Sequence, residues 1–121
     1  MSSPTVYSDK ITLTSSSYFE IASNRLIDLG NGLIWGRVSG KLLQARAVDQ
    51  AFILGYVNSN FTPTYSVPCT TTVGSSSVYG AVDCRIYGTD ATERNRQIYA
   101  KVTRDIAAGT YVYVNFVYYL G

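Results

Sequence analysis

Hydrophobic and polar residues alternate along the second half of the chain with the period of two that is typical of β-strands. The clearest case spans residues 78 to 87. One face of this segment carries Val78, Gly80, Val82, Cys84 and Ile86. The other face carries Tyr79, Ala81, Asp83, Arg85 and Tyr87. We expect the first face to pack in a core and the second to be half exposed, as a ligand surface or a subunit interface.

The last predicted strand, residues 110–120, is apolar or aromatic on both faces. One face carries Val112, Val114, Phe116, Tyr118 and Leu120, and the other carries Tyr111, Tyr113, Asn115, Val117 and Tyr119. A strand that is covered on one side only has polar residues on the other. The tyrosine face therefore predicts a covering partner, and a second copy of the chain is the usual one. The predicted oligomer interface consists of Tyr111, Tyr113, Asn115 and Tyr119.

Shorter strands are predicted at 10–14, 33–38, 42–48, 51–54, 69–73 and 96–103. A tight turn at Ser39-Gly40-Lys41 would join the second of these to the third. Residues 18–29 fit either a short helix capped by Ser17 or two strands hinged at Ser23-Asn24, and the β character of the rest favours strands. Short strands separated by Gly, Ser and Asn turns predict an all-β fold, an antiparallel β-sandwich or barrel-like head domain.

Composition narrows the possible chemistry. The 121 residues include 11 tyrosines, two cysteines and no histidine. Without histidine, Ser–His and Cys–His nucleophilic sites and the common zinc sites are excluded. No pattern indicates a bound cofactor or metal. Cys69 and Cys84 are expected to be small buried residues on neighbouring strands, or a disulfide if the strands align.

Charge and hydropathy exclude other classes of partner. A net charge of +2, with the basic residues scattered, lacks the footprint of a nucleic-acid-binding protein. No apolar run approaches the length of a membrane span, so membrane insertion is not expected. The start of the chain does not have the pattern of a secretory signal.

The order of features from Leu33 onward resembles the C-terminal head (knob) domains of phage receptor-binding proteins and tail fibres. A predicted strand pair precedes Leu54-Gly55, and the following loop ends in the aromatic-x-proline step Phe61-Thr62-Pro63. A strand with Gly80 and Arg85 follows, and the chain ends in an aromatic strand. The resemblance implies a head domain over residues 30–121, preceded by an N-terminal segment, 1–29. It also implies a homotrimer on a phage tail tip that contacts other virion proteins and binds a host cell-surface saccharide.

Saccharides stack on aromatic rings, and their hydroxyls bond to carboxylates, amides and guanidinium groups. Loops rich in Tyr and Asn, such as 56–68, are typical of recognition surfaces. The predicted ligand-binding residues are Trp35, Arg37, Asn58, Asn60, Tyr65, Tyr79, Asp83, Arg85 and Tyr87. For Trp35, a buried position in the core is the alternative. The alternative function is a structural virion oligomer that binds only protein, and enzymatic activity is not expected because no carboxylate pair lies in a recognisable motif.

Overall fold

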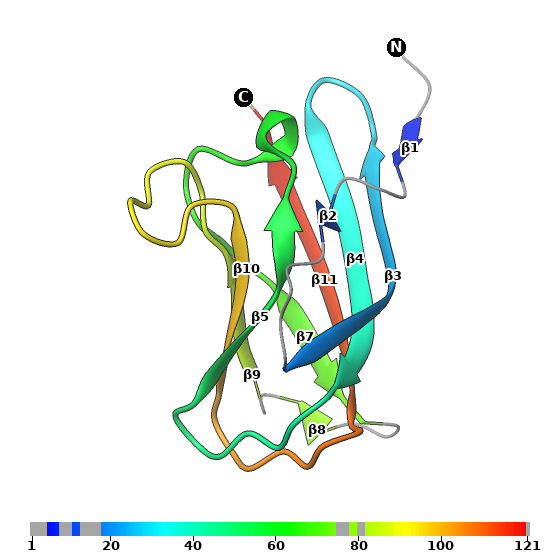
Figure 1. Cartoon of the computed structure of the whole chain (residues 1–121). Coiled ribbons are helices and arrows are strands. Elements are labelled where there is room, and N and C mark those ends of the chain that lie inside the picture. The colour runs from blue at the N-terminus through cyan, green and yellow to red at the C-terminus, as the bar shows by residue number, and fades with distance from the viewer. Residues whose placement is uncertain (1–4, 8–10, 13–17, 75–77, 80–81, 121) are drawn as a thin grey trace.

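The protein is an antiparallel β-sandwich (Figure 1), which confirms the predicted fold class. The computed structural model describes residues 5–7, 18–74 and 82–120, and the backbone of residues 11–12 and 78–79. Each strand pairing within these ranges is antiparallel, and a single 3₁₀ turn, η1 (Ser59–Phe61), is the one helical element. The described part of the chain therefore contains no helix with the length and hydropathy of a membrane span.

Two sheets form the two layers of the sandwich. Sheet A has the strand order β1 (Thr5–Tyr7), β3 (Phe19–Asp28), β4 (Leu33–Leu42), β11 (Tyr111–Tyr119), β7 (Thr70–Val73) and β8 (Val78–Tyr79). Sheet B has the order β2 (Ile11–Thr12), β5 (Ala51–Val57), β10 (Gln97–Val102), β9 (Val82–Ile86) and β6 (Val67–Pro68). Pro68 lies in an edge strand, where its missing N–H costs no ladder hydrogen bond.

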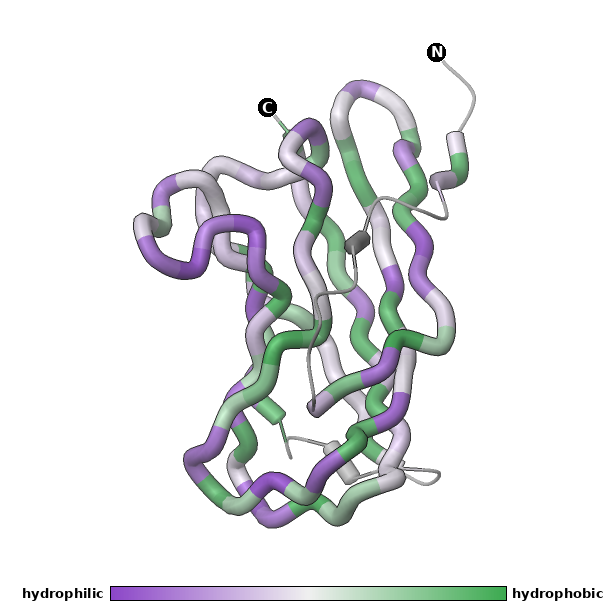
Figure 2. Tube along the Cα trace, viewed as in Figure 1, coloured by the Kyte–Doolittle hydropathy of each residue, from purple (hydrophilic) through white to green (hydrophobic). Residues whose placement is uncertain are grey.

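The core lies between the sheets and is built from alternate residues of the strands. Buried residues alternate with less buried ones along the whole of β4. The loop between β9 and β10, in contrast, is mainly hydrophilic (Figure 2). In β11, the predicted inward residues Val112, Val114, Phe116 and Tyr118 are buried. In β9, Val82, Cys84 and Ile86 are buried as predicted. The two-residue period therefore located the inner face of both strands correctly.

The turn predicted at Ser39-Gly40-Lys41 is wrong, because β4 continues as one strand from Leu33 to Leu42. Gly40 is buried inside this strand, where it lies opposite Ile21 of β3. A Cβ atom at Gly40 would lie 2.6 Å from Cζ of Phe19 and would also collide with the Glu20 carbonyl oxygen. Glycine is present here because a ring and a backbone approach closely, and not because the chain turns.

Residues 18–29 are neither a helix nor two hinged strands. They form the single long strand β3, and the predicted hinge is reduced to a register shift between Ile21 and Ser23. Leu26 and Phe19 anchor this strand in the core. A turn with positive φ at Gly30, Asn31 and Gly32 joins β3 to β4, so the domain boundary expected at residue 30 falls in the β3–β4 hairpin.

The alternation along residues 78–87 predicted one strand, but the structure has two, β8 and β9. β8 pairs with β7 in sheet A, whereas β9 pairs with β10 in sheet B. Residues 80–81, which connect them, and the side chain of Tyr79 lie outside the described residues. Alternation reports which side of a strand is buried but not which sheet the strand joins, so Tyr79 and Asp83 belong to different layers.

Candidate functional site

The predicted ligand residues lie on three separate surfaces. Trp35 and Arg37 lie in β4, on the outer face of sheet A. Another group lies on the outer face of sheet B and consists of Asp83, Arg85 and Tyr87. The third lies in and beside the loop that follows β5 and consists of Asn58, Asn60 and Tyr65. These eight residues therefore do not form one site, and the side chain of the ninth, Tyr79, lies outside the described residues.

On the outer face of sheet A, an apolar row crosses four strands. Direct cross-strand pairing places Val6 opposite Ile27, Ile27 opposite Trp35, and Trp35 opposite Val117. We call Val6, Ile27, Trp35 and Val117 the tryptophan row. Val6 is 56% exposed and Val117 is 51% exposed, and the two residues between them are half buried. Trp35 is therefore part of a surface platform and not of the core.

A polar and basic row lies beside it, two residues along each strand. Arg25 lies opposite Arg37, Arg37 opposite Asn115, and Asn115 opposite Thr70. We call Arg25, Arg37, Asn115 and Thr70 the arginine row. Both arginines are exposed, and neither forms an ion pair or side-chain hydrogen bond within the described residues. Side chains in directly opposed positions have Cβ atoms about 4.5–5.5 Å apart, so the two guanidinium groups can reach one ligand group.

Hydroxyl groups and tyrosine rings border the arginine row on its other side. Ser23 and Ser39 lie opposite one another with their Oγ atoms 2.7 Å apart. Tyr113 continues this row and stacks on Tyr111, with ring centroids 6.3 Å apart. At the opposite end of the face, Tyr119 is 65% exposed. The predicted interface residues therefore share one surface with Trp35 and Arg37.

Sequence reasoning missed Arg25, Ile27 and Thr70 as members of this surface. Their neighbours across the sheet are fixed by the register of β3 and β7, and the register was not available while residues 18–29 were open to two interpretations. The sequence around Arg25 has no clear alternation of apolar and polar residues, so no sequence signal marked Arg25 as outward-facing.

The aromatic rings on sheet B are covered by the chain itself. The Arg94 guanidinium lies 4.5 Å from the Tyr99 ring centroid and 5.8 Å from that of Tyr87, and these two rings pack edge to face. Arg85 lies 3.7 Å from an Asp83 carboxylate oxygen. Because these groups already have intramolecular partners, they are less available to a ligand than those on sheet A.

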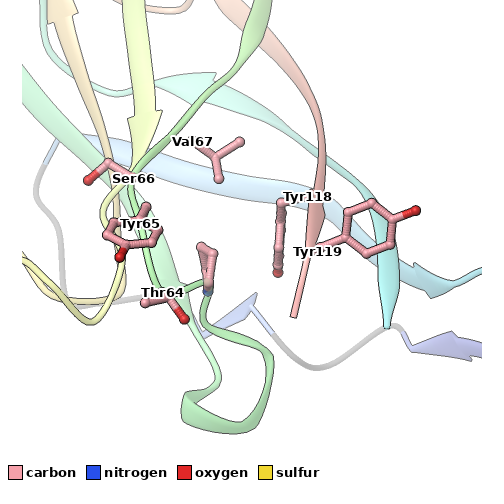
Figure 3. Close-up of a pocket in the computed structure, with 7 residues that line it drawn as sticks. Thr64, Tyr65, Ser66, Val67, Tyr118 and Tyr119 are labelled. Carbon is pink, nitrogen blue, oxygen red and sulfur yellow. The ribbon is translucent and has the colours of Figure 1, made fainter. Parts of the chain in front are cut away.

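A groove of about 490 Å³ lies between the loop after η1 and the end of β11 (Figure 3). It is lined by Pro63, Thr64, Tyr65, Ser66, Val67, Tyr118 and Tyr119. Tyr65 is 73% exposed, and the Tyr119 side chain points away from the groove. The Tyr118 hydroxyl donates a 2.6 Å hydrogen bond to the Phe61 carbonyl, and burial raises the pKa of Tyr118. Asn58 has a structural role beside the groove, because its Oδ1 accepts a hydrogen bond from the Asn60 N–H and caps η1.

The two cysteines are free thiols that lie on adjacent chain segments. The Cys69 N–H donates a 3.0 Å hydrogen bond to the Cys84 carbonyl. A side-chain hydrogen bond with Cys69, together with burial, raises the pKa of the Cys84 thiol. Cys84 is therefore a protonated packing residue at neutral pH.

The described residues contain no group of three or more Cys, Asp or Glu side chains arranged to hold a metal ion. Comparison of the chain with protein-family models, with curated proteins and with solved structures gives no match. The fold and the outer face of sheet A therefore provide the basis for the functional interpretation.

Proposed function

We propose that this chain is a binding domain that recognises a host cell-surface saccharide, as the head of a phage receptor-binding protein at the tail tip. The observation that carries the proposal is the outer face of sheet A. There, the half-buried Trp35 lies one row from Arg37 and Asn115. An aromatic ring offers a stacking surface for a pyranose, and adjacent guanidinium and amide groups bond to its hydroxyls.

The proposal places saccharide and subunit contacts on two parts of the same face, which meet at Asn115 of β11. The saccharide covers the β3–β4 part, around Trp35. A neighbouring chain of a homotrimer covers the β11 part, where Tyr111, Tyr113 and Tyr119 are each more than 40% exposed. This division is supported by the two opposed arginines, because burying unpaired guanidinium groups against a second copy is costly.

One variant for each of the three surfaces tests this proposal. We expect Trp35→Ala to weaken binding to a glycan array or to intact host cells roughly tenfold, which corresponds to about 1.4 kcal/mol. Arg85→Gln on sheet B and Tyr65→Ala in the groove serve as matched controls and are expected to retain binding. Circular dichroism establishes that each variant is folded.

Two results contradict the proposal. Failure of the unmodified protein to bind any cell, cell-wall preparation or glycan removes the saccharide function. Loss of binding in Arg85→Gln or Tyr65→Ala, with binding retained in Trp35→Ala, moves the site to another surface.

A structural virion oligomer that binds only protein is the second candidate function. The observation in its favour is the apolar character of the tryptophan row, in which Val6 and Val117 are each more than half exposed. Surfaces of this kind are typical of protein–protein contacts. Purified partner proteins of the same virion that bind the chain, in the absence of any glycan binding, support this second candidate.

A further inference from the structure

The arginine row carries an inference about the kind of saccharide, and this inference rests on the proposed function. We propose that the ligand is an acidic saccharide, with a carboxylate or phosphate group held between Arg25 and Arg37 while its sugar ring packs against Trp35. Three features of the sheet support this assignment: the opposed positions of the arginines, the lack of an anionic neighbour among the described residues, and the adjacent apolar platform.

Arg25 and Arg37 are direct cross-strand partners on an exposed face. Like charges in such positions destabilise a sheet. Among the described residues, the acidic side chain on this face is that of Glu20, which lies opposite Lys41 at the far end of β4. Asp28, on the same strand, directs Oδ1 to the Gly30 N–H 2.8 Å away. Within the described part of the chain, the two positive charges thus have no anionic partner, and a ligand can supply one.

The geometry suits a group with two or three oxygen atoms. A guanidinium presents its N–H groups as a planar fork that matches carboxylate or phosphate oxygens, and charge-assisted hydrogen bonds of this kind are the strong ones. Asn115 continues the row on the next strand, and its amide can bond to a neighbouring hydroxyl. On the other side of the arginines, Ile27 and Trp35 form the apolar floor.

The sheet-B arginine provides a contrast within the same molecule. Arg85 also lies on an exposed strand face, but Asp83 is 3.7 Å away on the same strand. Asp83 compensates the charge of Arg85, whereas no described acidic residue pairs with Arg25 or Arg37. The sequence places similar numbers of acidic and basic residues overall, so the uncompensated pair is a local feature and not a consequence of a strongly basic chain.

An array that holds neutral, carboxylate-bearing and phosphate-bearing glycans tests the inference. We expect the unmodified protein to bind acidic glycans. This binding should weaken as NaCl is raised from roughly 0.05 to 0.5 M, because salt screens the attraction between exposed charges. The carboxylate and phosphate arms of the array distinguish the two sources of the anion. Arg25→Glu and Arg37→Gln are each expected to weaken binding roughly tenfold or more, because each removes charge-assisted hydrogen bonds.

Stability measurements separate lost binding from lost folding. Arg25→Glu converts a like-charge pair into an ion pair with Arg37, so its melting temperature is expected to equal or exceed that of the unmodified protein. Arg85→Gln is the matched control and is expected to bind as the unmodified protein does. The combination of an unchanged or higher melting temperature with lost binding identifies a ligand role for the arginines.

The outcomes distinguish this inference from the function on which it rests. Binding to neutral glycans alone, or full binding of acidic glycans by Arg25→Glu, overturns the inference and leaves the saccharide-binding proposal intact. Absence of binding to every glycan overturns both. Equal binding to duplex DNA or to an acidic polypeptide also overturns it, because the recognition would then be for charge without a sugar.

Discussion

Individual residues in this sandwich divide into those with partners inside the chain and those without a partner among the described residues. Tyr118 belongs to the first group. It is buried at the end of β11, and its hydroxyl bonds to the Phe61 carbonyl 2.6 Å away. Arg25 and Arg37 belong to the second group. At the residue scale, the sequence predicted Tyr118 as inward-facing from alternation alone, but the opposition of the two arginines required the sheet register.

The Tyr118 hydrogen bond predicts a pH-dependent stability difference. At neutral pH, we expect Tyr118→Phe to lower the free energy of unfolding by about 1–2 kcal/mol, because the Phe61 carbonyl loses its donor. Burial raises the pKa of Tyr118 in the folded protein. The unfolded chain therefore ionises first as pH rises past about 10, and the stability contributed by the tyrosine is lost in that range.

Urea denaturation at pH 7, 9, 10 and 11 measures this effect. The stability difference between the unmodified protein and Tyr118→Phe is expected to narrow above about pH 10. Tyr65→Phe, at a position that is 73% exposed, is the control and is expected to match the unmodified protein throughout. A difference that stays constant with pH would show that the hydroxyl does not contribute through its ionisation.

At the scale of elements, the correct and incorrect predictions have a common physical origin. Apolar residues at every second position mark the buried face of a strand, so the inner faces of β9 and β11 were predictable from the sequence. Strand ends and sheet membership depend on tertiary neighbours. Glycine at position 40 is typical of a turn in the sequence, yet the Phe19 ring lies against it and β4 continues through this position. The chain leaves sheet A between β8 and β9, although the alternation of 78–87 is unbroken.

The role of Gly40 inside β4 predicts a large effect for a small substitution. A methyl group at this position would lie 2.6 Å from the Phe19 ring and would collide with the Glu20 carbonyl. We expect Gly40→Ala to lower the free energy of unfolding by about 2–3 kcal/mol, as overpacking of a dense core does. Denaturant unfolding is the measurement.

Ser39→Ala, at the neighbouring outward position, is the matched control for Gly40→Ala. Its expected change is at most about 1 kcal/mol, because it removes one hydrogen bond, to the Ser23 hydroxyl, and creates no overlap. A Gly40→Ala variant as stable as this control would contradict the claim that Phe19 and the Glu20 carbonyl leave no room for a side chain at position 40.

At the scale of the whole molecule, the two sheets differ in how their outer faces are completed. On sheet B, Arg94 covers the rings of Tyr87 and Tyr99, and Asp83 is paired with Arg85. On sheet A, the tryptophan row, the arginine row and the tyrosines of β11 have no such cover from the described part of the chain. The two-faced pattern of residues 110–120 was enough to predict an uncovered surface. It did not reveal that the predicted ligand residues Trp35 and Arg37 lie on that same surface, because their proximity arises from the β4–β11 pairing.

A homotrimer joined through the β11 part of this face is the last prediction, and light scattering in solution tests it. The expected mass is close to three times 13.3 kDa. Tyr119→Lys is expected to reduce the mass to that of one chain, because it places a charge where a 65% exposed ring would otherwise be buried against a neighbour. Tyr65→Lys changes a ring of similar exposure outside this face and should leave the mass unchanged. A monomeric unmodified protein would contradict the trimer and would assign the exposed rings of β11 to the ligand. If Tyr119→Lys and Tyr65→Lys both reduced the mass to that of one chain, the interface would lie at the groove instead.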